Sequence, residues 1–146
     1  MTLFPYTTLF RSRPSRMNDS PPSPTESRRG VLLFAHGSRD ARWREPVEAV
    51  AARIRLQDPQ VLVACSYLEL VVPDLPTAAA RLVADGADAL RIVPLFLGIG
   101  KHAREDLPLL VEDLRAAHPS VDITVASAVG EDPRVIELLA NMALNG

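Results

Sequence analysis

The sequence predicts a three-layer α/β/α domain built on a four-stranded parallel sheet. From Gly30 onward, four apolar runs of strand length alternate with four segments of helical periodicity. The first of these runs, residues 31–35, is continuously apolar, as expected of a strand that is covered on both faces. A repeat of this kind joins neighbouring strands through helical crossovers, which gives a parallel sheet with helices on both faces.

The strands come from the apolar runs. We expect strands over residues 31–35, 61–68, 89–96 and 121–126. The longest apolar run, residues 92–99, is far shorter than the roughly 20 residues that span a bilayer. No membrane partner is therefore expected.

The helices come from the segments between these runs. We expect helices over residues 40–57, 74–84, 103–117 and 132–144. Asp74 and Asp132 can each cap a helix through a side-chain oxygen. Pro46 suits only a first turn, so the regular part of the first helix should begin near Glu45. Gly86 ends the second helix, because glycine readily adopts the left-handed conformation that follows many helices.

The first residues read differently from the rest of the chain. Residues 2–12 resemble the in-frame translation of a sequencing-adapter oligonucleotide and show no structural period. We interpret residues 1–16 as an assembly artefact, with Met17 as the natural start; a targeting peptide would need an apolar core and a cleavage site. Residues 17–29 are rich in proline and serine and predict a disordered leader. The domain then spans residues 30–146.

This interpretation makes a prediction of its own. A chain that starts at Met17 should keep the thermal midpoint and the activity of the full chain, because no core-type periodicity precedes Gly30. Thermal unfolding and activity measured on both chains test this. A clear loss of either property would show that residues 1–16 belong to the fold.

Charge and cysteine content exclude several classes of function. The formal net charge is −2, and it becomes −5 without residues 1–16, which hold three arginines and no acid. No basic patch suggests a nucleic-acid partner. Cys65 is the single cysteine, so neither an internal disulfide nor a cysteine metal cluster can form. This fits a cytoplasmic protein, and Cys65, central in a strand, is expected to be an inert core thiol.

Three predicted strands end in residues that can bind a metal. His36 follows the first strand, Glu69 follows the second, and His102 follows the third. Ligands of parallel α/β sheets bind beyond the carboxyl ends of the strands, so these side chains should converge at one edge. Neutral imidazole and carboxylate bind divalent metals such as cobalt(II) and iron(II), and histidine accepts a proton near neutral pH. Nearby glycines at positions 37, 98 and 100 would let the backbone approach a bulky ligand.

Each of these residues also has a purely structural interpretation. Either histidine alone could be a hydrogen-bonding loop residue, and Glu69 could cap the following helix. Asp40 is expected to cap the first helix rather than react. His118 lies near the end of the third helix, where a cation suits the helix dipole. Trp43 could pack on the domain or form part of a ligand-binding wall.

Three sequence blocks resemble a known family. LLFAHGSRDARWREP, SYLELVVPDLPTA and VPLFLGIGKHAREDLPLL, in this order, are similar to the small class II chelatases of the CbiX type, and the resemblance covers residues 30–144. It implies a chelatase-like fold and the insertion of cobalt(II) or iron(II) into sirohydrochlorin, for cobalamin or sirohaem synthesis. It also implies that His36 and His102 are the metal-binding and catalytic pair, and that Glu69 is a metal ligand or proton acceptor. Family members need no ATP and no further cofactor, and the short form pairs as a homodimer.

One position departs from the family pattern. The residue before the second histidine is often glycine in the family, whereas here it is Lys101. A cation beside the metal slightly disfavours metal binding, but it could meet a carboxylate of the substrate. Sirohydrochlorin is rich in carboxylates, so four cations are candidate substrate contacts, although each could equally be a solvated surface charge: Arg39, Arg42, Lys101 and Arg104.

Two other classes of function compete with this interpretation. A histidine phosphatase would carry an arginine before the histidine of the first strand end, where this chain has Ala35. A metal-delivery protein would use the same ligands without chemistry, and the residues alone do not exclude it.

Overall fold

The computed structural model describes residues 26–146. The predicted artefact at residues 1–16, and the predicted leader up to residue 25, lie outside the described residues. The end of that leader makes specific contacts: Ser27 donates a hydrogen bond to Asp88, and Arg29 forms an ion pair with Asp58. None of the helices in the described part of the chain is long and apolar enough to cross a membrane.

The four predicted strands form one parallel sheet. The strands are β1 (Arg29–Ala35), β2 (Leu62–Tyr67), β3 (Ala89–Pro94) and β4 (Asp122–Val125), in the order β2-β1-β3-β4. The predicted fold class is therefore confirmed. Strand β1 lies between β2 and β3, so the segments that follow these three strands emerge side by side at the carboxyl edge.

The predicted helices are present, with shifted starts. They are α1 (Glu45–Gln57), α2 (Leu75–Ala84), α3 (Lys101–Ala117) and α4 (Pro133–Asn145), with short 3₁₀ turns η1 (Ala41–Arg44) and η2 (Val129–Glu131). As predicted, the regular first helix begins at Glu45 with Pro46 in its first turn, and Asp40 caps the preceding η1 by accepting a hydrogen bond from the Arg42 N–H. Helix α3 begins two residues earlier than expected, so His102 lies in its first turn rather than in a loop.

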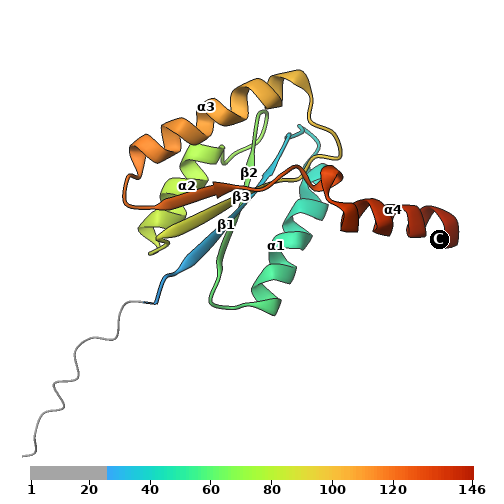
Figure 1. Ribbon diagram of the computed structural model, residues 1–146, viewed down its shortest axis with the longest axis horizontal. Coiled ribbons are helices and arrows are strands. Elements are labelled where there is room, and N and C mark those ends of the chain that lie inside the picture. Colours follow the sequence, from blue (N-terminus) through green and yellow to red (C-terminus); the bar gives the residue numbers. More distant parts are fainter. Residues whose placement is uncertain (1–25) are drawn as a thin grey trace, which may run out of the picture.

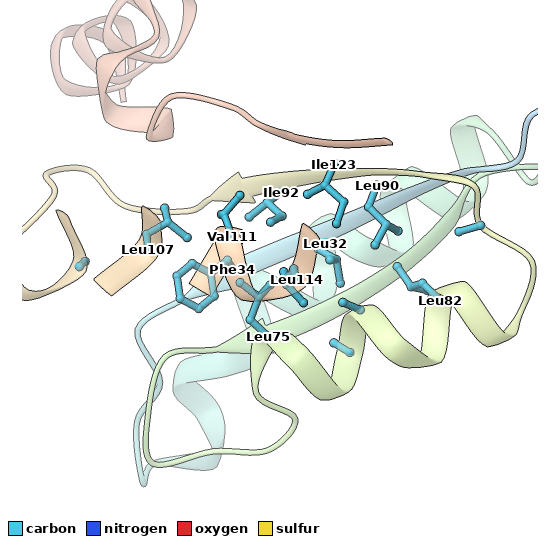
Figure 2. Close-up of a cluster of buried hydrophobic side chains, with 14 of the residues drawn as sticks. Leu32, Phe34, Leu75, Leu82, Leu90, Ile92, Leu107, Val111, Leu114 and Ile123 are labelled. Carbon is cyan, nitrogen blue, oxygen red and sulfur yellow. The ribbon is translucent and has the colours of Figure 1, made fainter. Parts of the chain in front are cut away.

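Helices α2 and α3 cover one face of the sheet, and α1 covers part of the other (Figure 1). Figure 2 shows the larger core, in which Leu32 and Phe34 of β1 meet side chains from α2 and α3. The smaller core, beneath α1, contains Leu33, Val47 and Tyr67. Neighbouring residues of β1 thus point into opposite cores, which explains why this strand is apolar throughout.

The structure also places Cys65, Trp43 and His118. The half-buried Cys65 thiol lies 3.8 Å from the Val47 carbonyl oxygen, and burial raises its pKa, so it stays protonated at neutral pH. The Trp43 ring packs 6.2 Å from the Tyr67 ring, although it is 37% exposed. His118 is the half-buried residue that follows the last turn of α3.

Candidate active site

A hollow at the carboxyl edge of the sheet brings together four of the predicted site residues. Its volume is about 530 Å³, and its lining includes His36, Glu69, Lys101 and His102. These four side chains are exposed, so they are accessible to a ligand. The structure thus places the two histidines and Glu69 around the same opening, although they are far apart in sequence.

The His36 ring is held by an apolar wall. It packs against the ring of Phe96, with centroids 4.2 Å apart and planes inclined by 41°. Phe96 is buried and meets Phe34 edge-on at 5.7 Å. This packing fixes the plane of the imidazole without using either ring nitrogen, so both nitrogens remain available to a metal or a proton.

The loops that carry His36 and Glu69 are joined to each other. The Glu69 N–H donates a hydrogen bond to the His36 carbonyl (3.0 Å), and the Leu68 N–H donates one to Ala35 (2.9 Å). Gly37 has a φ of +102°, and a Cβ at this position would overlap the carbonyl oxygen of Glu69. Sequence reasoning assigned Gly37 to ligand approach, whereas the structure shows that the neighbouring loop itself requires glycine here.

Glu69 also begins a strained turn. Its carbonyl accepts a hydrogen bond from the Val71 N–H (2.8 Å), which closes a three-residue turn around Leu70. Leu70 has a φ of +65°, a left-handed conformation that costs free energy for any residue except glycine. Strain of this kind persists where the surroundings fix the backbone, and it often accompanies functional sites.

His102 lies at the amino end of α3. Gly100 precedes the helix without a side-chain cap, so N–H groups of the first turn and the positive end of the helix dipole face the site region. Asp106, one helical turn after His102, lines the same hollow. Sequence reasoning missed Asp106, although its spacing of four residues from His102 was the signal for a shared helix face.

The four candidate substrate cations do not form one group. Lys101 lines the hollow with the histidines. Arg39 lines a separate hollow of about 310 Å³, together with Arg44. Arg104 lines a third hollow, beside α3 and β4, and Arg42 lines none of these three. Of the four, Lys101 alone shares the hollow of the predicted metal ligands.

The metal donors are not assembled into a closed cage. In residues 26–146, no cluster of three or more His, Cys, Asp or Glu side chains is arranged to hold a metal ion. Structural metal sites are fully closed by protein ligands, whereas sites that act on the metal keep open positions. Donors that share an open hollow are therefore suited to a metal that arrives and leaves.

The fold and this edge together define a small parallel α/β protein with an open, histidine-containing site at the carboxyl ends of its strands. The family model of CbiX matches residues 30–145. The chain belongs to the CbiX family. This membership argues against the histidine phosphatase interpretation.

Relatives and solved structures agree with the family. The chain is 32% identical over 114 residues to the sirohydrochlorin cobaltochelatase of Sulfolobus acidocaldarius. The matched region covers 78% of this chain and 89% of the relative. A CbiX protein from Marinobacter aquaeolei, assigned to cobalamin (vitamin B12) biosynthesis, matches with a TM-score of 0.69 and 35% identity, over 80% of this chain and 94% of that one. The sirohydrochlorin chelatase SirB of Bacillus subtilis subspecies spizizenii, solved in complex with cobalt, matches with a TM-score of 0.68 and 25% identity, over 81% of this chain and 51% of that one.

Proposed function

We propose that this protein inserts a divalent metal into sirohydrochlorin, with cobalt(II) favoured over iron(II). The observation that carries the proposal is the shared hollow of His36, Glu69 and His102 in a chain of the CbiX family. The similarity to the Sulfolobus sirohydrochlorin cobaltochelatase supports both the reaction and the preference for cobalt. The product then feeds cobalamin synthesis, or sirohaem synthesis if the metal is iron.

The chemistry needs a metal carrier and a proton acceptor. The incoming metal, as substrate, binds one or both of His36 and His102 through a ring nitrogen, and Glu69 is a further candidate ligand. Insertion forms bonds from the metal to the four ring nitrogens and releases two pyrrole protons. His102 or Glu69 accepts one of these protons and passes it to solvent, because both side chains are exposed, and solvent water takes the other.

The charges around the hollow orient the macrocycle. Lys101 meets a substrate carboxylate at the rim, and the amino end of α3 adds favourable potential for an anion. Arg39 meets a carboxylate further out, from its own hollow. Arg42 and Arg104 remain weaker candidates, because they lie outside the hollow of the histidines.

Three further properties belong to this proposal. The reaction uses no ATP and no cofactor beyond the metal that it inserts, and it takes place in the cytoplasm. The working form is a homodimer, since one small domain offers only one wall for a broad, flat macrocycle. SirB supports this assembly: the matched region is about half of that chain, which leaves room for a second domain of this size.

The absorbance spectrum of sirohydrochlorin tests the reaction. Adding cobalt(II) and a small amount of protein should shift the spectrum faster than the spontaneous reaction does, with many turnovers per protein molecule. A metal-delivery protein would instead accelerate at most one stoichiometric transfer of its bound metal. A rate equal to the background would contradict both functions.

Glu69 gives a graded prediction in the same assay. Glu69→Gln keeps the shape of the side chain but removes its ability to accept a proton. If Glu69 is the proton acceptor, the rate should fall about 10²–10⁴-fold. If it only orients a neighbouring group, the fall should be milder, below about tenfold. Glu45→Gln makes the same change at an exposed position outside this hollow and should leave the rate unchanged.

A further inference from the structure

Helix α4 presents an apolar face that nothing covers within the described chain. Its polar residues recur along one strip, at positions 134, 137, 141 and 145, and most of the remaining positions are apolar. Ile136, Leu138, Leu139 and Met142 are between 42% and 60% exposed, and no residue of α4 is buried. Among the described elements, only η2 is packed closely on this helix.

Hydrogen bonds hold the start of α4 in place. The Gly130 N–H in η2 donates to the Phe96 carbonyl (2.9 Å), and a Cβ on Gly130 would overlap the backbone of Leu97. Asp132 caps α4 by accepting from the Arg134 N–H (2.9 Å), and its pKa is lowered to about 2 by the Arg134 side chain. From this fixed start the helix points away from the sheet, as Figure 1 shows.

One face of β3 and β4 is not covered by a helix. Helix α1 packs on β1 and β2, so the same face of β3 and β4 carries no helix. The strand register shows which residues form that face. Arg91 of β3 pairs with Val31, on the α1 side of β1, and with Thr124 of β4. Arg91 and Thr124 are exposed, while Val93, Leu95 and Ala126 are half-buried. Parallel sheets are normally covered by helices on both faces. Here one face of β3 and β4 lacks a helix, while α4 extends into solvent with its apolar side uncovered.

We propose that α4 of each copy packs on the bare face of β3 and β4 in a second copy of this chain. The proposal deepens the homodimer proposed above and rests on it. A 13-residue helix is about 20 Å long and about 10 Å wide, so one buried side of it, taken as half a cylinder, covers roughly 300 Å². Two reciprocal exchanges, counted on both partners, bury about 1,200 Å², the lower end of the range of stable interfaces. A single exchange would bury about half of this, so the reciprocal, two-fold symmetric form is the stable one.

The exchange also places the second copy near the active site. Helix α4 starts beyond the carboxyl end of β4, and its η2 turn is bonded to Phe96, whose ring supports His36. A copy held by α4 therefore lies beyond the edge that carries the hollow. This arrangement supplies the second wall that a broad macrocycle requires.

Sedimentation of the full chain tests the interface. The unaltered protein should sediment as a dimer, and Leu139→Asp should raise its dissociation constant at least about 100-fold, because each dimer carries the lost apolar contact twice. Asn141→Asp adds the same charge on the polar strip and should stay dimeric. Helix α4 lies outside both cores, so neither variant should change the thermal midpoint of the monomer. A dimer that withstands Leu139→Asp overturns the α4 interface but leaves the homodimer standing, whereas a fully active monomeric wild type overturns both.

Cross-linking identifies the surface that α4 meets. A photoreactive benzoyl-phenylalanine in place of Ala143, on the apolar side of α4, is irradiated in a mixture of isotopically heavy and light chains. We expect mixed heavy–light products joined to the peptide that contains Arg91 and Val93. Products within one chain would show that α4 folds back, and products joining two α4 helices would show helix pairing; either result overturns the proposed exchange.

Discussion

Replacing His36 or His102 with alanine should lower the rate of metal insertion about 10²–10⁴-fold, the usual contribution of a positioned acid–base group. Both imidazoles line the hollow at the carboxyl edge, and each can hold the metal or accept a pyrrole proton. Both side chains are exposed, so their removal leaves the cores intact. The effect should therefore appear in the rate, with little change in the thermal midpoint.

The measurement is the cobalt-dependent shift of the sirohydrochlorin spectrum, corrected for the spontaneous reaction. His118→Ala is the matched control, since this histidine follows the far end of α3 and lies outside the hollow. It should keep the wild-type rate. Wild-type rates in both the His36 and the His102 variants would show that the site lies elsewhere.

The strand pattern carried most of the fold prediction. Four mainly apolar runs that alternate with helical segments indicated the number of strands and their parallel arrangement. The run of β1 is continuous because this strand is covered on both faces, whereas β4 contains Asp122 and Thr124 and is buried only at Ile123. Caps also placed helix ends well: Asp74 accepts a hydrogen bond from the Thr77 N–H, and Gly86 follows α2 with a φ of +103°. These signals are local, so they do not depend on how distant segments pack.

Signals that depend on distant contacts were missed. The start of α3 moved to Lys101 because Gly100 precedes it in an extended conformation, and no side-chain cap marked this boundary. The start of α4 is held by the bond between Gly130 and Phe96, which joins two segments that are far apart in the chain. An amphipathic pattern indicates that a helix buries one face, but it does not indicate against which surface.

In the candidate site, too, some features followed from local sequence signals and others depended on tertiary packing. Convergence of His36, Glu69 and His102 followed from the rule that parallel strands end at one edge, and the structure places all three around one hollow. The support of His36 by Phe96 depends on tertiary packing, which the sequence does not display. The separation of Arg39 and Arg104 from Lys101 likewise follows from which side of each element the hollow occupies.

Gly37 links the stability of the fold to the geometry of the site. Gly37→Ala forces a side chain into a left-handed backbone conformation, at a cost of about 1–3 kcal/mol, and drives its Cβ into the Glu69 carbonyl. The two loops must then move apart, which displaces His36 from Glu69. A misplacement of about 1 Å can cost about 10²-fold in rate, so we expect this loss together with a lower thermal midpoint. Gly98→Ala is the matched control, because nothing lies within 4 Å of its Cβ position; its midpoint should stay unchanged. Equal midpoints and rates for the two variants would show that the joined loops do not position the site.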